Sequence, residues 1–217
     1  MVLPMVVGTC RENSEGMSNK ILVWACMRSK SAREVLMDSE LYSLRQLFHE
    51  VVADCYVKHA GMDDSEITSY VADLLTDFSD ADRLYRLRDA QGKPLEDMAA
   101  MLLASDPVLG YATSFEAERE IRKHIGDYSL FHAGMYPELT NSGPKQDRAR
   151  YLELVQAGKD SYYVVSQFNV FEYAVEAPLF ERLAESFELC IYGLSKVRGE
   201  LDRLHVQSAQ NKQMRLM

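Results

Sequence analysis

Apolar residues recur at three- and four-residue steps over nearly four heptads in the C-terminal part of the chain, the strongest periodicity of the sequence. This spacing predicts one long helix that begins near Pro178. The stripe predicts either the central spine of an antiparallel bundle or the seam of a homodimer, because both use the same spacing. Its burial would contribute more than about ten kcal/mol gross, so either arrangement would dominate the fold. The stripe consists of Phe180, Leu183, Phe187, Cys190, Ile191, Leu194, Val197, Leu201 and Leu204.

The same kind of spacing predicts three helices in the first half of the chain. From Ser39 onward an amphipathic helix runs to Gly61, which is placed to end it. Asp63 and Glu66 form the pattern of a capping box, in which side chains bind the free backbone N–H groups of a helix start, and predict a second helix. A short third helix restarts over 79–82.

Three further helices are predicted before the C-terminal one. Residues 91–94 predict a turn that places Pro94 at the first helical position of a short helix. Thr113 and Glu116 form a second capping-box pattern and predict the start of a longer helix. Another helix is predicted over about 147–168.

These elements predict an all-α fold: a single-domain antiparallel bundle of about six helices with a long C-terminal helix. The length of 217 residues suits one domain with a substantial core. We expect residues 1–38 to form an irregular segment, residues 39–206 the bundle, and residues 207–217 a frayed tail.

The charge balance excludes several classes of partner. The chain has 24 Lys and Arg against 33 Asp and Glu, a net charge of −9, so the basic face that nucleic acids and anionic membranes require is not expected. The longest apolar run, residues 21–27, is far too short to span a membrane. The four cysteines are scattered without metal or disulfide spacing, and we expect a cytoplasmic protein.

Carboxylates and a histidine gather on one face of the helix that follows Thr113. Residues 116, 120, 124 and 127 fall within about 80° of one another on a helix, so their side chains can point the same way. A histidine with carboxylates one turn away is how helical bundles hold metals, which predicts an iron, manganese or zinc site. The alternative is a solvated face with ion pairs four residues apart. The candidate ligands are Glu116, Glu120, His124 and Asp127.

His132 lies on the apolar stripe of the same helix and is expected to point inward. A buried imidazole needs a polar partner, and nearby tyrosines could supply one. His132 is therefore a core histidine with a satisfied hydrogen bond, a catalytic acid or base, or an additional ligand of the predicted metal site. A pocket for a small, partly apolar molecule is the third prediction. Its expected lining is Tyr128, His132, Tyr136, Tyr151 and Tyr162.

Two segments carry a family resemblance: GDYSLFHAGMYPE at 126–138 and YLELVQAGKDSYY at 151–163. They resemble a recurrent pair of segments in uncharacterised bacterial all-helical proteins, a family with no assigned activity. The resemblance implies a bacterial source. It also implies that Gly126, Gly134 and Pro137 shape a particular helix end.

No known catalytic motif is complete in the chain. His49 and Glu50 begin a zinc-protease pattern, but Ala53 stands where the second histidine is required. Phosphate-binding glycine loops and nucleophile elbows are absent. The leading prediction is therefore a helical binding or interaction protein, self-associating as a homodimer through its C-terminal helix. The metal-dependent protein and the small-ligand protein are the alternatives.

Overall fold

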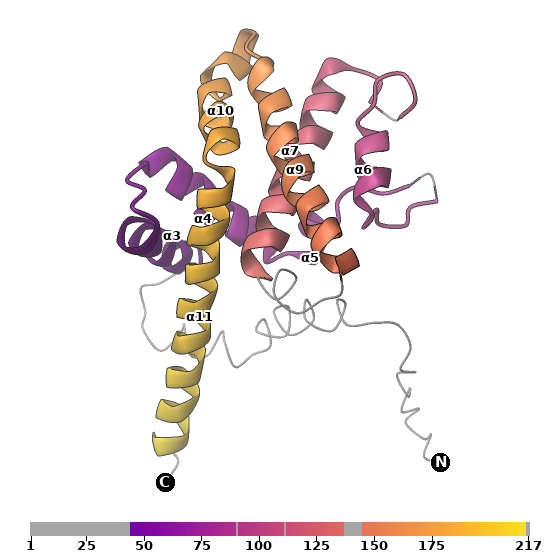
Figure 1. Cartoon of the computed structure of the whole chain (residues 1–217). Helices are drawn as coiled ribbons and strands as arrows, with labels where there is room; N and C mark the ends of the chain where they lie inside the picture. Colours follow the sequence, from indigo (N-terminus) through magenta and orange to yellow (C-terminus); the bar gives the residue numbers. More distant parts are fainter. Residues whose placement is uncertain (1–43, 90, 111, 137–144, 216–217) are drawn as a thin grey trace, which may run out of the picture.

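The computed structural model describes residues 44–89, 91–110, 112–136 and 145–215. Most of these residues are helical and none forms a strand, which confirms the predicted all-α class; one isolated bridge joins Arg88 to Pro94. Among them are eight α-helices, one π-helix and one 3-10 helix (Figure 1). The elements are α3 Leu44–Cys55, η1 Tyr56–Ala60, α4 Ser65–Phe78, α5 Ala81–Leu84, α6 Met98–Ala104, α7 Phe115–Met135, α9 Lys145–Gln167, η2 Phe171–Val175, α10 Ala177–Glu185 and α11 Phe187–Arg215. Residues 1–38 and the expected closure at Pro137 lie outside the described residues.

Gly61 ends the first helix as predicted, and its φ of 64° is a left-handed conformation that glycine adopts without strain. The two capping boxes were misplaced by one residue. The cap of α4 is Asp64, whose carboxylate accepts hydrogen bonds from the backbone N–H groups of residues 66 and 67. The cap of α7 is Ser114, whose hydroxyl accepts from the backbone N–H of residue 117. Each cap directly follows the polar residue that was predicted, Asp63 or Thr113. It is this second polar residue that has the extended backbone a cap requires.

The predicted start of the short helix at Pro94 was wrong. Pro94 lies in the isolated bridge with Arg88, across a turn in which Gly92 has a φ of 80°. Helix α6 begins four residues later, where the Asp97 carboxylate accepts from the backbone N–H of residue 100. An aspartate cap satisfies a free N–H group directly, whereas a proline only avoids having one.

The predicted C-terminal helix is divided at Ser186 into α10 and α11. The N–H of Ser186 still bonds the carbonyl of Arg182, and the N–H of Cys190 bonds the carbonyl of Ser186, so the break interrupts only one residue. The apolar stripe therefore stays in register across it. Six of its residues are at most 1 % exposed within the chain, as a spine requires: Phe180, Leu183, Phe187, Cys190, Leu194 and Val197. Helix α11 continues to Arg215, into the residues expected to fray.

Helix α7 is more deeply enclosed than the C-terminal stripe. Every residue from His124 to Met135 is buried, on all sides of the helix. Helices α9, α11, α6 and α4 pack around it (Figure 1). No helix among the described residues has the length and apolarity needed to cross a membrane.

Glycines let aromatic side chains approach two of the packed helices. A Cβ atom added at Gly193 of α11 would lie 2.5 Å from the ring of Tyr56, whose hydroxyl donates to the carbonyl of Cys190 at 2.8 Å. Gly126 of α7 faces the ring of Tyr162 in the same way. Each glycine therefore fixes the distance between two elements.

We predict opposite effects for two Gly-to-Ala substitutions in α11. Gly193→Ala should destabilise the protein by about 1–3 kcal/mol, because the Tyr56 ring is anchored and cannot move aside. Gly199→Ala meets no atom within 4 Å and should stabilise by about 0.5–1 kcal/mol through helix propensity. Urea unfolding of both variants measures the difference. Equal stabilisation by the two would contradict this packing.

Candidate functional site

A buried carboxylate lies at the centre of the packed helices. Asp127 of α7 is 7 % exposed, and its Oδ1 accepts hydrogen bonds from the hydroxyls of Tyr70 of α4 at 2.5 Å and Tyr162 of α9 at 2.7 Å. Lys123 lies one turn away, with its Nζ 4.0 Å from the other carboxylate oxygen. Three helices are thereby joined at one side chain. We call Asp127, Tyr70 and Tyr162 the carboxylate clamp.

Burial raises the pKa of Asp127 above its ordinary value, and the Lys123 ammonium and the two hydroxyls only partly offset this. Burial, together with the neighbouring carboxylate, also raises the pKa of both tyrosines well above 10. The hydroxyls are thus neutral donors at any ordinary pH. Tyr162 is fully buried and Tyr70 half-buried, and their hydrogen bonds to Asp127 hold the three helices together.

A ladder of rings runs along α7 at four-residue spacing. The ring centroids of His124 and Tyr128 are 6.3 Å apart, those of Tyr128 and His132 4.1 Å, and those of His132 and Tyr136 5.6 Å. His124 is 1 % and His132 3 % exposed. The prediction that His132 points inward is confirmed.

The two histidines are held neutral. Burial lowers the pKa of His132 to about 4. For His124, burial, assisted by the charges of Arg86 and Lys123, lowers the pKa to about 3. The Nε2 atom of each ring has no hydrogen-bond partner among the described residues, and the partner expected for His132 stays a prediction. An acid or base role for His132 stays a prediction, without a neighbouring nucleophile to support it.

The four candidate metal ligands do not converge. Asp127 belongs to the carboxylate clamp, His124 packs edge-to-face against Phe78 at 5.7 Å, and Glu120 pairs with arginines. Glu116 is exposed near the start of α7. Within the described ranges no three His, Cys, Asp or Glu side chains are grouped so as to hold a metal ion. The alternative of a solvated face, which also included Arg119 and Lys123, fails for Arg119 and Asp127, which are buried.

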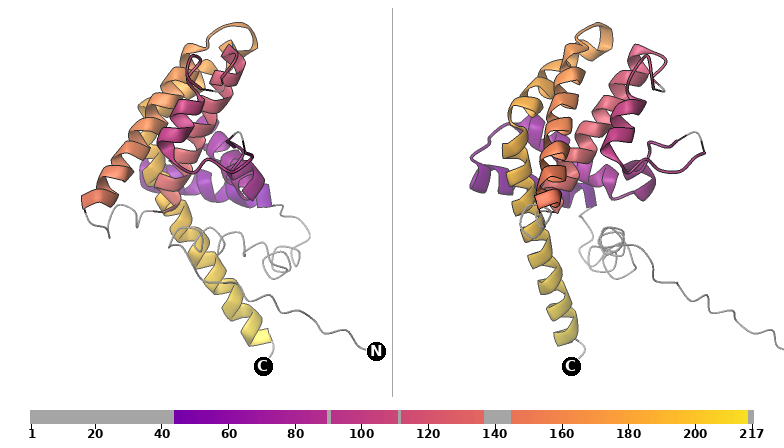
Figure 2. Two further views of the ribbon diagram at one scale, coloured as in Figure 1. Left: turned by 90° about the vertical axis from the view of Figure 1, so that its right-hand side faces the viewer. Right: turned by 45° about the vertical axis from the view of Figure 1, so that its right-hand side comes forward.

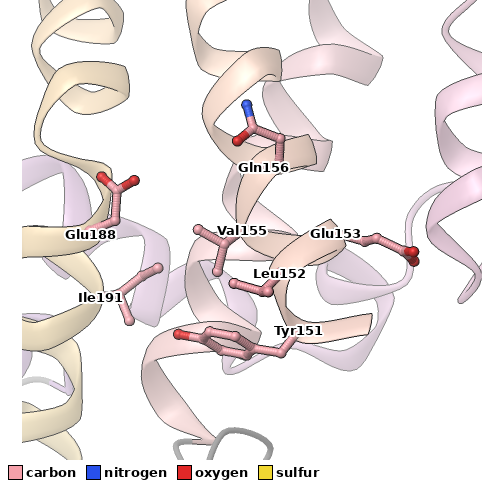
Figure 3. A pocket seen from close by; sticks show the side chains of 7 residues that line it. All are labelled: Tyr151, Leu152, Glu153, Val155, Gln156, Glu188 and Ile191. Atoms are coloured by element: carbon pink, nitrogen blue, oxygen red, sulfur yellow. The ribbon is translucent and has the colours of Figure 1, made fainter. Parts of the chain in front are cut away.

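The tyrosines predicted to line one pocket are dispersed. Tyr128 and Tyr136 flank His132, but Tyr162 lies in the clamp. Tyr151 instead lines an open groove of about 530 Å³ between α9 and α11 (Figure 3). The other residues of the groove are Leu152, Glu153, Val155, Gln156, Glu188 and Ile191.

Sequence reasoning missed Arg119, which is 3 % exposed although it stands among charged neighbours on α7. Its guanidinium lies 4.2 Å from the ring centroid of Tyr173, donates to Glu176 at 2.6 Å, and donates to Glu120 at 3.1 Å. Both Tyr173 and Glu176 belong to the segment between α9 and α10. Arg119 therefore fixes η2 against the N-terminal end of α7.

Sequence reasoning also missed an exposed apolar surface at this end of the molecule. Phe171 is 88 %, Val175 84 %, Phe115 81 % and Val170 55 % exposed. Phe115 lies 6.2 Å from the ring of Phe168, and η2 and the start of α7 are neighbours in both views of Figure 2. We call Phe115, Val170, Phe171 and Val175 the apolar tip.

The apolar tip has two further distinguishing properties. Phe171 has a φ of 53°, the one positive φ of a non-glycine residue within the described residues, and such a backbone costs about 1 kcal/mol or more. The segments that carry the tip, 105–118 and 168–181, contain no Lys or Arg, but Arg119 and Arg182 directly follow them and Arg119 pairs with Glu176. Their acidic residues are Asp106, Glu116, Glu118, Glu172, Glu176 and Glu181.

We predict different costs for two substitutions of the buried carboxylate. Asp127→Ala leaves two buried hydroxyls without an acceptor and should destabilise by about 3 kcal/mol or more. Asp127→Asn keeps an acceptor oxygen and removes the buried charge, so its cost should stay within about 1 kcal/mol. Because the folded-state pKa of Asp127 is raised, the wild type should lose stability relative to Asp127→Asn as pH rises above about 4.

Urea unfolding of the three proteins between about pH 4 and 8 tests this account. Asp82→Ala provides the control, because that side chain is 92 % exposed. If Asp127→Ala were as stable as Asp127→Asn, the hydroxyls would not depend on the carboxylate.

We predict a second pH dependence from the histidine ladder. The unfolded chain binds protons at the ordinary histidine pKa of about 6.5, whereas folded His132 binds them only near pH 4. Stability is therefore lost as pH falls from about 6.5, by about 2 kcal/mol for this group at pH 5. His132→Phe should remove that part of the slope, and the exposed His205→Phe should not. Equal slopes in wild type and His132→Phe would show that folding does not lower the pKa of His132.

No known protein family, characterised protein or solved structure matched this chain in the comparisons made. The resemblance predicted for 126–138 and 151–163 stays a prediction. The function is therefore inferred from the residues and contacts of the chain itself.

Proposed function

We propose that this protein is a binding protein whose apolar tip docks a basic, apolar-faced segment of a partner protein. The observation that carries the proposal is the exposure of the apolar tip: three of its side chains are more than 80 % exposed. Exposed apolar clusters of this kind on soluble proteins mark interaction surfaces. Val108 and Leu109, exposed 85 % and 75 %, lie in the loop that leads into α7 at the same end of the molecule (Figure 1).

The charge around the tip favours a cationic partner. Six acidic residues belong to the two segments that carry it, against two basic residues, Arg119 and Arg182, that directly follow them, and Arg119 pairs with Glu176. This field repels nucleic acids and anionic membranes, and it disfavours the docking of two copies tip to tip. A segment with apolar side chains on one face and Lys or Arg at its edge complements both properties of the surface.

The tip is held in a defined shape before any partner arrives. Arg119 stacks on Tyr173 and pairs with Glu176, so the two segments of the tip are joined by a nearly buried cation. Phe171 combines a strained backbone with an exposed ring. A surface ordered in advance loses less conformational entropy on binding.

Other parts of the proposal go beyond the tip. We treat the helices as one antiparallel bundle domain and place the protein in the bacterial cytoplasm, on the scattered cysteines and the family resemblance. Self-association through the C-terminal helix stays a prediction; Leu189 and Tyr192 of α11, exposed 40 % and 45 %, are the residues that favour it. The metal-dependent protein and the small-ligand protein also stay predictions, and the described residues contain no group of His, Cys, Asp and Glu side chains to favour the first of them.

We predict that the tip binds a fluorescent amphipathic peptide with Leu and Phe on one face and Lys on the other. In the full chain, the double variant Phe171→Asp and Val175→Asp should weaken binding at least about tenfold, because it places charge in the apolar contact. Fluorescence anisotropy measures the dissociation constant.

Two controls separate this contact from non-specific attraction. Val206→Asp changes the same residue type at 53 % exposure, far along α11, and should leave binding unchanged. A peptide with Glu in place of Lys should not bind. Equal affinity of the tip variant and the Val206→Asp variant would refute the proposed site.

A further inference from the structure

One stretch of this chain has the chemistry that the apolar tip is proposed to bind. Residues 20–33 contain the run ILVWACM at 21–27, and no acidic residue occurs from Gly16 to Arg33. In a chain of net charge −9, this stretch stands out as both apolar and basic. Its basic residues are Lys20, Arg28, Lys30 and Arg33.

The tip is the surface of the described residues that best complements this stretch. It combines three of the largest apolar exposures with six acidic residues, of which Glu176 pairs with Arg119, against two basic residues, Arg119 and Arg182, that directly follow its segments. The groove between α9 and α11 is a weaker candidate. Its Glu188 is already paired with Lys159 at 2.9 Å, and the exposed Arg148 and Arg150 stand at the start of α9.

The stretch can reach the tip. Ten residues, 34–43, separate it from the start of α3, and an extended chain of that length spans about 33 Å. A short series of side-chain contacts leads from the start of α3 to the tip, each about one side chain long. Arg45 of α3 pairs with Asp73 of α4 at 2.8 Å. One turn earlier on α4, the ring of Tyr70 lies 5.5 Å from the ring of Phe180. The Arg119 guanidinium lies 5.7 Å from the Phe180 ring and 4.2 Å from the ring of Tyr173 in η2.

We propose that residues 20–33 occupy the apolar tip of their own chain when no partner is bound. This inference rests on the docking function proposed above and adds its regulation. A tethered segment has a high effective concentration at its site, so a partner must displace it to bind. The protein would then respond only to partners whose basic segment outcompetes its own.

Trp24, the single tryptophan of the chain, lies inside the apolar run and reports its environment directly. In the full chain we expect blue-shifted Trp24 fluorescence that acrylamide quenches weakly. The Phe171→Asp and Val175→Asp double variant should shift the emission to the red and raise quenching to that of the urea-unfolded chain. Val206→Asp should leave both unchanged.

A second pair of substitutions tests the same contact from the other side. Reversal of two charges by Arg28→Glu and Lys30→Glu should release Trp24 in the same way and strengthen binding of the Lys-bearing peptide at least about tenfold, because the competing segment is removed. Circular dichroism verifies that each variant is folded. The tip positions are exposed, so folding is expected to survive their substitution.

The outcomes separate the two proposals. If tip substitutions abolish peptide binding but leave Trp24 fluorescence unchanged, the tip is a docking site and the proposal that residues 20–33 occupy it is refuted. If the tip substitutions shift Trp24 emission to the red while no peptide binds even to the Arg28→Glu and Lys30→Glu variant, the contact between residues 20–33 and the tip stands. Docking of a separate partner is then refuted. If neither quantity responds, both proposals are overturned.

Discussion

The structure depends on the burial of a polar helix. Helix α7 is enclosed on all sides from His124 to Met135, although its sequence includes an aspartate and two histidines in that stretch. The carboxylate clamp makes this burial tolerable, because two tyrosine hydroxyls from α4 and α9 satisfy the one carboxylate oxygen that both reach. The same bonds fix how α4, α7 and α9 meet. Gly126 then allows the Tyr162 ring to lie directly against the α7 backbone.

The apolar tip inherits its geometry from that arrangement. Helix α7 leaves the core at its N-terminal end, where Arg119 is buried and its guanidinium holds η2 beside the helix. From Phe115 to Glu118 the helix carries only apolar and acidic side chains, and none of them is buried. The buried core thus carries, at one end, a surface in which three apolar side chains are more than 80 % exposed. The four tip residues come from two segments more than fifty positions apart in sequence, so only the fold assembles the surface.

Periodicity predicted the existence of most helices, and it predicted the buried C-terminal stripe and the inward His132. Local chemistry was less well predicted: Asp64 and Ser114 cap helices where Asp63 and Thr113 were expected, because either member of a polar doublet can cap. The candidate site was largely missed. Glu116, Glu120, His124 and Asp127 share a helical face, but partners from other helices decide which are buried, and spacing along one helix carries no information about them. Tyr70 and Arg119 were missed for the same reason.

Methyl-labelled nuclear magnetic resonance of the full chain tests the central claim most directly. Valine methyl groups lie in the tip at Val170 and Val175, in the groove between α9 and α11 at Val155, and on distant surfaces at Val57 and Val206. On titration with the Lys-bearing amphipathic peptide, the account predicts saturable shifts at Val170 and Val175 alone among these five. Shifts confined to Val155, or spread evenly over all five, would contradict the assignment of the tip as the binding surface.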